Sequence, residues 1–242
     1  MNLKVLSYNI HKGFSSRNKE FVLDKIKESI EKSPADIVFL QEVVGSEGAG
    51  KYTSQFEFLA DTVWSHHSYG KNSASSTGHH GNAILSKFPF IFSTNVDLSV
   101  NEIEERGMIH GIVRIPETNM KIHLLCTHLS LFQTQRKIQI EKIGQYINTH
   151  IPEDVPLILA GDFNDWQENI TPHMLIKHSL FEAFSVSSGR TAKSFPSWFP
   201  FLRLDRIYYR NINLVSVDLH RDHPWNALSD HLALSSEFST QD

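Results

Sequence analysis

The feature that most constrains this chain is a run of four apolar residues, Leu157–Ala160, followed directly by Gly161, Asp162, Phe163 and Asn164. An apolar run of this kind, without alternation, predicts a strand buried on both faces. Gly161 is expected to end the strand. The carboxylate of Asp162 and the carboxamide of Asn164 would then lie just beyond the strand end, where they can order a water molecule or bind a phosphate. Because Asp and Asn also form ordinary turns, this stretch alone leaves a structural turn as the alternative.

Polar residues able to do chemistry flank several other apolar runs in the same way. Asn9, Glu42 and His128 each come just after a run, and His231 comes just before one. Strand ends at one edge of stacked sheets are neighbours in space, so these side chains are expected to converge on one cleft. A single residue of this kind is usually a turn former or a surface group, and it is the repetition that indicates a site.

The chain reads as many short strands with helices between them. Apolar or alternating segments predict strands at 3–10, 36–42, 81–86, 90–98, 107–115, 121–127, 157–160, 202–209, 213–219 and 232–238. Amphipathic or compact segments predict helices at 16–32, 52–60 and 132–147. His66–His80, rich in Ser, Gly and His, is expected to be a mobile loop, and residues 165–200 to be irregular. The economical architecture is two packed β-sheets flanked by helices.

Composition and charge limit the classes of function. Charged residues make up 21% of the 242 residues and the AVILMFWYC group 40%, which is typical of a globular protein and predicts one domain over residues 1–242. A net charge of −4 argues against avid nonspecific DNA binding, although a local basic patch stays open. The N-terminal apolar run is too short for a signal peptide, and the one cysteine, Cys126, allows a reducing compartment. We therefore expect a cytoplasmic monomer without a transmembrane segment.

The polar residues at the strand ends suit one kind of chemistry. Carboxylate and amide oxygens such as those of Glu42 and Asn9 favour Mg²⁺ or Mn²⁺ over zinc. The sequence has no HExxH helix and no cysteine pair for zinc, no GxSxG elbow for a serine nucleophile and no GxxxxGK[ST] loop for a nucleotide. What remains is a water nucleophile, a divalent cation that binds phosphate oxygens, and histidines as acid/base groups. This combination predicts phosphoester hydrolysis.

Seven short motifs, in order along nearly the whole chain, carry a family resemblance: Tyr8-Asn9-Ile10-His11, Gln41-Glu42, Gly81-Asn82-Ala83-Ile84-Leu85-Ser86, Thr127-His128, Gly161-Asp162-Phe163-Asn164, Leu204-Asp205-Arg206-Ile207 and Ser229-Asp230-His231. Together they resemble the endonuclease/exonuclease/phosphatase superfamily, which contains DNase I, AP endonucleases, inositol-polyphosphate 5-phosphatases and bacterial sphingomyelinases. The Tyr-Asn-Ile-His opening is similar to that of small bacterial members. The resemblance implies a DNase I-like α/β (α+β) fold, a four-layered sandwich of two mixed β-sheets flanked by helices, and Mg²⁺-dependent phosphoester cleavage.

The resemblance also implies a role for each matched residue. Glu42 would be a metal ligand, with Asn9 beside it and Asp230 supporting the metal or its waters. Asp162 would align and activate the attacking water, and Asn164 would hold the scissile phosphate. His231, oriented by Asp205, would contact the phosphate and stabilise charge in the transition state. His128 would protonate the leaving oxygen.

Four further residues are candidates for substrate binding. His11 follows Asn9 closely enough to face the metal, or it is a solvent-facing loop residue; Asn82 lines the phosphate site or caps a strand; Arg106 clamps phosphate or pairs with a neighbouring glutamate. Trp198 belongs to the aromatic segment 195–202, which is either an exposed substrate contact or folded into the core. Alternation in the following strand is expected to place some of its arginines on the cleft side, the candidates being Arg203, Arg206 and Arg210.

Three functions are compatible with this sequence. The first is a Mg²⁺- or Mn²⁺-dependent nuclease or related phosphodiesterase that acts on DNA, and this is the prediction. The alternative is a phospholipid (sphingomyelinase-like) or small-molecule phosphoesterase, suggested by the aromatic segment and the weak basicity. The third, a catalytically idle binding module, is disfavoured because the full set of site residues is present: Glu42, Asp162, Asn164, Asp205 and His231.

Overall fold

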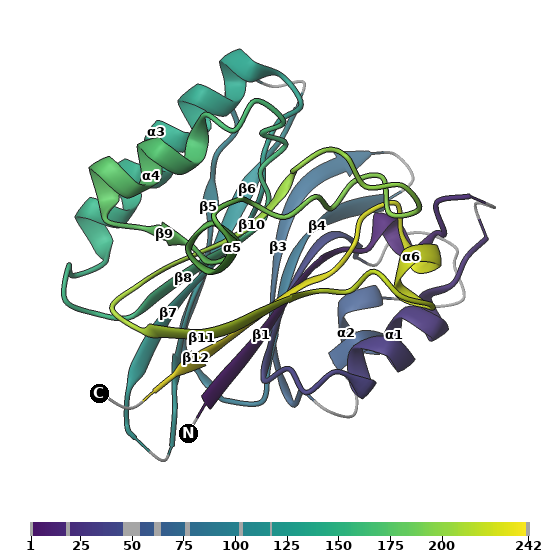
Figure 1. Ribbon diagram of the computed structural model, residues 1–242, viewed down its shortest axis with the longest axis horizontal. Coiled ribbons are helices and arrows are strands. Elements are labelled where there is room, and N and C mark those ends of the chain that lie inside the picture. Colours follow the sequence, from purple (N-terminus) through teal and green to yellow (C-terminus); the bar gives the residue numbers. More distant parts are fainter. Residues whose placement is uncertain are drawn as a thin grey trace.

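The computed structural model describes residues 2–17, 20–45, 54–60, 64–75, 78–101, 104–116 and 118–240. Two six-stranded β-sheets pack face to face, and helices cover the outer face of each (Figure 1). This is the four-layered α/β sandwich that the sequence predicts.

The first sheet contains the strands nearest the two ends of the chain. In spatial order its strands are β11 (Asn213–Leu219), β12 (Leu234–Ser239), β1 (Asn2–Asn9), β2 (Ile37–Val44), β4 (Gly78–Ser86) and β3 (His66–Ser75). β1 and β2 run parallel, and the other neighbouring pairs are antiparallel. Asn9 pairs with Gln41 where β1 ends. Glu42 therefore follows at the same edge.

The second sheet contains the strand predicted from the apolar run at 157–160. In spatial order its strands are β5 (Phe90–Asp97), β6 (Gly107–Arg114), β7 (Lys121–His128), β8 (Leu157–Asp162), β10 (Asp205–Arg210) and β9 (Phe181–Glu182). β7 and β8 run parallel, and the other pairs are antiparallel. The register sets Asp162 beside both His128 and Asp205. Three predicted site residues are thus neighbours on three adjacent strands.

Helices close the sandwich on both sides (Figure 1). The first sheet is covered by α1 (Leu23–Lys32), α2 (Gln55–Ala60) and the short α6 (Trp225–Leu228). The second sheet is covered by α3 (Gln133–His150) and α4 (Ile170–His178), while α5 (Ala183–Ser188) lies by β10 and β11, and the 3-10 turn η1 (His11–Gly13) follows β1. In the described part of the chain, no helix is long and apolar enough to cross a membrane.

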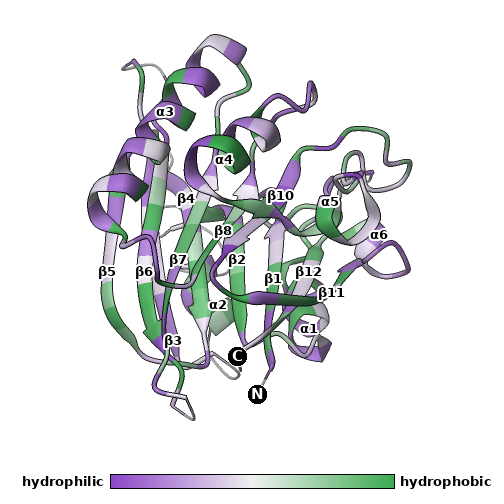
Figure 2. Ribbon diagram, turned by 60° about the vertical axis from the view of Figure 1, so that its left-hand side comes forward, coloured by the Kyte–Doolittle hydropathy of each residue, from purple (hydrophilic) through white to green (hydrophobic). Residues whose placement is uncertain are grey.

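Apolar side chains form a core between each pair of layers. Along β1, Leu3 and Val5 pack between the sheets, whereas Leu6 and Tyr8 pack against the helices of the first sheet. A third cluster fills the space between the second sheet and α3, with Ile143 among its members. The strands are accordingly rich in hydrophobic residues while the covering helices carry hydrophilic ones (Figure 2). Burial on both faces explains why the inner strands read as continuous apolar runs.

The prediction of a mobile loop over His66–His80 is wrong. Most of this segment forms β3 and the start of β4, which pair antiparallel from His66 opposite Ser86 to Ser75 opposite Gly78. β3 lies at the edge of its sheet and is only partly buried, so its strand is defined by backbone pairing rather than by apolar side chains. Polar composition hides such a strand from sequence patterns.

Other boundaries also shift. The helix predicted at 16–32 begins only at Leu23, because Phe14 and Phe21 form an antiparallel bridge before it. The helix predicted at 52–60 begins at Gln55, and residues 52–53 lie outside the described part of the chain. The segment 165–200 is not irregular throughout, since it contains α4, β9 and α5. Asp165 accepts a hydrogen bond from the Ile170 backbone at the start of α4, a local cap that periodicity alone does not reveal.

Candidate active site

The two sheets are joined by a hydrogen bond at the edge where the candidate residues gather. Asn9, at the end of β1, donates from Nδ2 to Asp162 Oδ2 at 3.0 Å and to Glu42 Oε1 at 3.5 Å. Asn9 and Asp162 are each only 1% exposed. Ser229 Oγ donates to the Asn9 carbonyl oxygen at 2.7 Å and fixes the end of β1 from the C-terminal side. Four segments distant in sequence are thereby joined at one point.

Unusual backbone conformations aim the side chains at this edge. Glu42 and Asn164 have φ values of 57° and 49°, in the left-handed region that residues with side chains rarely adopt. Gly161 has a φ of 148°, and a Cβ there would collide with the carbonyl oxygen of Thr127 in the neighbouring strand. Glycine is therefore required at the end of β8 for the close approach of β7. Such conformations concentrate at functional sites because the surrounding structure must hold them.

His231 lies between two buried carboxylates. Its Nδ1 is 2.9 Å from Asp205 Oδ2, and its Nε2 is 3.6 Å from Asp162 Oδ2. Burial by itself would lower the pKa of His231, but the charges of Asp205 and Asp162 outweigh it and raise the pKa to about 10. Ser194 Oγ donates to the same Asp205 oxygen at 2.5 Å. The imidazole is thus held protonated and in one orientation.

His128 faces the same carboxylate from the opposite side. Its Nε2 is 3.5 Å from Asp162 Oδ2. Burial lowers the pKa of His128 to about 3, and the positive charges of Arg106 and His231 add to that effect, although Asp162 opposes it. At neutral pH one buried histidine of the site is protonated and the other neutral, a division that suits acid/base chemistry.

The oxygen atoms around Asn9 fit a hard divalent cation. Asp162, Asp205 and His231 form a tight cluster of possible ligands, but the His231 imidazole is occupied by two carboxylates and is protonated, so it suits a proton donor better than a metal ligand. The carboxylate of Glu42 lies next to this cluster and offers oxygen atoms without a histidine proton, while Asn9 turns its Nδ2 toward the Glu42 and Asp162 carboxylates and accepts from the His11 backbone N–H at its Oδ1. An all-oxygen set of this kind prefers Mg²⁺ or Mn²⁺.

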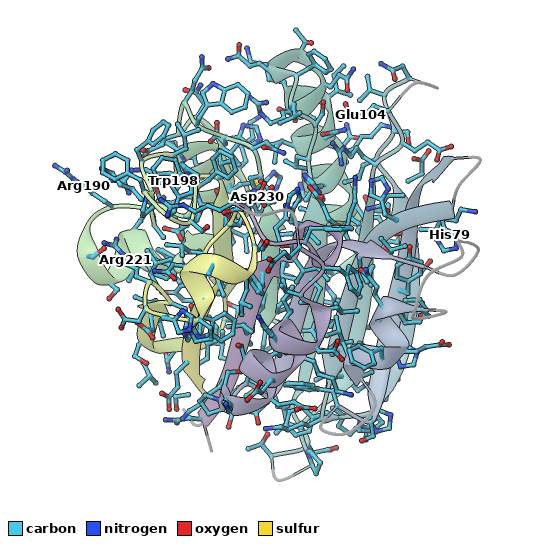
Figure 3. The ribbon with its side chains drawn as sticks, turned by 90° about the vertical axis from the view of Figure 1, so that its right-hand side faces the viewer. His79, Glu104, Arg190, Trp198, Arg221 and Asp230 are labelled. Carbon is cyan, nitrogen blue, oxygen red and sulfur yellow. The ribbon has the colours of Figure 1, made fainter. Side chains whose placement is uncertain are left out.

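Asp230 and His11 form the more open side of the site. Their closest atoms, His11 Nδ1 and Asp230 Oδ1, are 3.8 Å apart, and both side chains are partly exposed. The His11 backbone N–H donates to Asn9 Oδ1 at 3.1 Å. Asp230 is labelled in Figure 3, where it lies close to the end of the first strand and beside the loop that carries Trp198.

Asn164 and Asn82 are placed by bonds to backbone carbonyls. Asn164 Nδ2 donates to the Leu129 carbonyl oxygen at 2.9 Å, and its backbone N–H donates to Asp162 Oδ1 at 2.9 Å. Asn164 therefore adjoins the cluster and also ties the loop after His128 to it. Asn82 is fully buried between the sheets, where Nδ2 donates to Gly107 O at 3.0 Å. Among the described residues, the hydrogen-bond partners of Asn82 are backbone groups rather than site side chains.

The arginines around the site form ion pairs and hydrogen bonds with other groups of the protein. Arg106 lies near enough to His128 to lower the pKa of that histidine, and its Nη2 pairs with Glu104 Oε1 at 2.6 Å. The prediction that strand alternation turns arginines toward the cleft is wrong for Arg206 and Arg210. Both are buried and donate to backbone carbonyl oxygens rather than to the carboxylates of the acidic cluster. Arg203 pairs with Glu168 at 3.0 Å.

Trp198 is exposed, at 53% of its surface, so the aromatic segment is not folded wholly into the core. The Arg17 guanidinium lies 5.0 Å from its ring centre.

Sequence patterns missed three residues that shape the site: Ser194, which bonds Asp205; Ser229, which bonds Asn9; and Phe195, whose ring lies 4.9 Å from the His231 ring. Ser229 had a signal in its place directly before Asp230 and His231, and Phe195 had one in its place at the start of the aromatic segment 195–202.

Comparison with known proteins identifies the family to which this arrangement belongs. The profile of the Endonuclease/Exonuclease/phosphatase family matches residues 6–231, which include the site residues from Asn9 to His231. The chain belongs to this family. "Uncharacterized protein YbhP" of Escherichia coli (strain K12) is 40% identical to this family member, with the match covering 98% of this chain and 96% of that protein.

Solved structures share the fold at low sequence identity. The endonuclease/exonuclease/phosphatase from Beutenbergia cavernae aligns with a TM-score of 0.79 at 18% identity, covering 98% of this chain and 71% of that one. TDP2 of D. rerio, in a complex with a single-strand DNA product, aligns with a TM-score of 0.75 at 18% identity over 99% of each chain. These likenesses confirm the predicted DNase I-like fold. The family membership supports a phosphoester hydrolase with nuclease or phosphodiesterase character.

Proposed function

We propose that the protein is a divalent-metal-dependent phosphodiesterase whose nucleophile is a water molecule positioned by Asp162. The observation that carries the proposal is the buried chain of contacts from Asp205 through His231 to Asp162, with Asn9 and Glu42 beside it. In this proposal, one edge of the sandwich would supply a carboxylate acceptor, a protonated imidazole and carboxylate oxygen atoms for a cation. Each of these elements contributes to metal-assisted phosphoester hydrolysis.

Asp162 is the centre of the proposed chemistry. Its Oδ2 accepts a hydrogen bond from Asn9 and faces both histidines, and its Oδ1 accepts from the Asn164 backbone. These contacts fix the carboxylate in one orientation, so that it can align a water molecule for attack on phosphorus. Asn164 would contact the phosphate through its remaining amide oxygen and N–H capacity.

The two histidines would take different roles. His231, protonated and oriented by Asp205, would bind a phosphate oxygen and stabilise the negative charge that develops on it. His128 is neutral without substrate. Its predicted role as the acid for the leaving oxygen therefore requires that a bound phosphate raise its pKa, as a nearby negative charge does.

Glu42, Asn9 and Asp230 would hold the cation. Bound there, Mg²⁺ or Mn²⁺ would polarise a phosphate oxygen and offset negative charge in the transition state. His11, which contacts Asp230 from outside, would position that carboxylate, and Arg106 would help to hold a phosphate beside His128. Asn82 would support the site by joining the two sheets, because its Nδ2 on β4 donates to backbone carbonyl oxygens of β6 and β7.

Two substrate classes remain from the sequence prediction. DNA is supported by the shared fold with TDP2, which has been solved with a single-strand DNA product. Phospholipid is supported by the exposed aromatic segment around Trp198. The chemistry at Asp162 serves either class, so the choice depends on the surface around the site rather than on the site itself.

A synthetic diester tests the proposed chemistry independently of the substrate class. Hydrolysis of bis-p-nitrophenyl phosphate is expected with Mg²⁺ or Mn²⁺ and is expected to stop in EDTA. Asp162→Ala should lower kcat by about a hundredfold or more, because the water loses its positioning carboxylate. Asp218→Ala, which removes an acid that is 72% exposed on β11, should leave the rate unchanged. Full activity of Asp162→Ala would contradict the proposal.

A further inference from the structure

Six large apolar side chains are exposed on three loops that surround the site. We call them the aromatic rim: Leu131, Phe132, Trp166, Trp198, Phe199 and Phe201, exposed by 57, 63, 41, 53, 66 and 54%, respectively. Each loop is joined to a strand that carries a site residue, namely β7 with His128, β8 with Asp162 and β10 with Asp205. Apolar groups gathered in this way on a surface usually mark a contact with another molecule or a membrane.

Contacts between the loops make the rim continuous. Gln133, next to Phe132, donates to Gln167, next to Trp166, at 2.6 Å. Glu168 pairs with Arg203 at 3.0 Å and so joins the β8 loop to the end of the loop that carries Trp198. The Phe195 ring contacts the His231 ring at a tilted angle of 54° and connects that loop to the acidic cluster. The rim is therefore one surface beside the catalytic centre rather than three separate patches.

The tip of the rim is held in place by hydrogen bonds from Ser197 to the segment 226–230. Ser197 is buried, and its Oγ donates to the Ser229 carbonyl oxygen at 2.6 Å and to the Asn226 carbonyl oxygen at 3.1 Å. The Ser197 N–H donates to the Asp230 carbonyl oxygen at 2.8 Å. Trp198 and Phe199 follow this anchor and stand exposed, in a position that does not depend on covering the core. A fixed apolar tip can enter a bilayer interface without a large ordering cost.

The charges near the rim distinguish a membrane from a nucleic acid. A nucleic-acid groove needs cations that track successive phosphates. Here Arg203 is neutralised by Glu168, and Arg136 is buried against the Trp166 ring, with its Nη1 bonded to backbone carbonyls. Instead, Arg17 lies against the Trp198 ring, and the exposed Arg190 and Arg221 project on the same side of the molecule as Trp198 (Figure 3). Aromatic residues at the tip with cations around it match an anionic lipid surface.

We propose that the aromatic rim docks the active site on a membrane surface that contains anionic phospholipid, so that the phosphoester cleaved is that of a lipid headgroup. The substrate part of this inference rests on the proposed phosphodiesterase function, whereas docking does not need catalysis. Trp198 and Phe199 would enter the interface, and Arg17 and Arg190 would lie at the level of the lipid phosphates. Asp162 would then face the lipid headgroups at the membrane surface.

Vesicle flotation in EDTA tests docking without hydrolysis. Wild-type protein and Asp162→Ala should both float with vesicles of phosphatidylethanolamine and phosphatidylglycerol, and less with phosphatidylcholine alone. The double variant Trp198→Ala/Phe199→Ala should lose about tenfold or more in partitioning, because two exposed rings no longer enter the interface. A control, Ile176→Ala/Phe181→Ala, removes side chains exposed by 81 and 46% on α4 and β9 and should bind as wild type.

Tryptophan fluorescence, headgroup release and binding of single-strand DNA test the remaining parts of the proposal. Brominated lipids should quench the tryptophan emission of the wild type, and Trp198→Phe should lose much of that quenching. Headgroup release from the vesicles with Mg²⁺ would support the substrate part, and its absence with intact docking would overturn that part alone. Failure of the wild type to float, or rim-dependent binding of single-strand DNA in its place, would overturn docking. Loss of diester hydrolysis with vesicle binding intact would count against the proposed function and not against docking.

Discussion

At the scale of single residues, environment separates groups of the same type. His231 and His128 contact the same carboxylate of Asp162, yet the pKa of His231 is raised to about 10 and that of His128 is lowered to about 3. Both imidazoles are buried, and the difference arises because His231 has a second carboxylate partner, Asp205, whereas His128 is near Arg106. The partners of each ring, rather than its burial alone, set its protonation state.

The first prediction concerns the titration of these two rings. In metal-free protein, NMR should show His231 protonated and His128 neutral at pH 7. Asp205→Asn should lower the pKa of His231 by at least about one unit, because one of the two negative charges that raise it is lost. The matched change Asp218→Asn, at the exposed acid 3.8 Å from His220, should leave His231 unaffected. A wild-type His231 that titrates near its ordinary value would contradict the assignment.

At the scale of elements, β8 depends on a close approach to β7. The parallel register puts Thr127 opposite Gly161 and His128 opposite Asp162. A side chain at residue 161 would push the strands apart at the point where they present His128 and Asp162. The glycine of the Gly-Asp-Phe-Asn motif is thus explained by strand packing, and its neighbours by chemistry.

The second prediction compares two glycine substitutions. Gly161→Ala should reduce the free energy of unfolding by at least about 2 kcal/mol, because it adds a backbone collision to an unfavourable φ. Gly189→Ala changes a residue with a φ of 78° in open space and should cost only about 1 kcal/mol. Urea denaturation at an unchanged m-value measures both. Equal costs would show that the collision with Thr127 is relieved.

A second contact between elements joins the sheet to α3. His110 on β6 lies 2.9 Å from His123 on β7 and 2.9 Å from the Tyr146 hydroxyl on α3, at the nearest polar atoms. Burial lowers the pKa of His110 to about 4, and the charges of His123 and His150 act in the same direction. The cluster is therefore neutral when the protein is folded at neutral pH.

The third prediction follows from this depressed pKa. Between about pH 6.5 and pH 4 the unfolded His110 binds a proton and the folded one does not, so stability is present above this window and falls as the pH decreases through it, by on the order of 2 kcal/mol. Thermal unfolding at several pH values should show this loss. His110→Phe should make the pH dependence shallower between pH 6.5 and pH 4, whereas an unchanged slope would show that other groups cause it.

At the scale of the whole molecule, the site exists only because two sheets meet. Asn9 and Glu42 come from the first sheet, and Asp162 and Asp205 come from the second. Their contact is made by a few hydrogen bonds across the junction, such as that from Asn9 to Asp162. A cation held at this edge would draw oxygen atoms from both sheets together and so stabilise the folded protein as a whole.

The fourth prediction is a metal-dependent rise in thermal stability. With Mg²⁺ or Mn²⁺ at about ten times its Kd, Tm should increase by about 3 °C or more. Glu42→Gln should lose this increase, because the carboxylate that draws the cation is gone. Glu28→Gln, a change at an acid 63% exposed on α1, is the matched control and should keep the increase. A metal effect that survives Glu42→Gln would place the cation elsewhere.

Much of the architecture could be predicted from the sequence because burial leaves a pattern in it. Strands enclosed on both faces, such as β8, must be apolar through most of their length, so that a polar residue near the end of such a run stands out. That rule found Asn9, Glu42 and Asp162 from local sequence alone. The same pattern did not predict the edge strand β3, since a half-exposed strand needs no apolar run.

The sequence by itself determined the inner strands and the polar residues near their ends, since burial on both faces leaves a local apolar run and the polar residue that interrupts it is visible in the same stretch. Only the tertiary structure decided which arginines face the site, because a buried guanidinium such as that of Arg206 is satisfied by carbonyl groups from distant segments. It also decided the protonation of the two histidines and brought the aromatic rim together. These properties depend on the distances between residues far apart in the chain, and local sequence does not contain those distances.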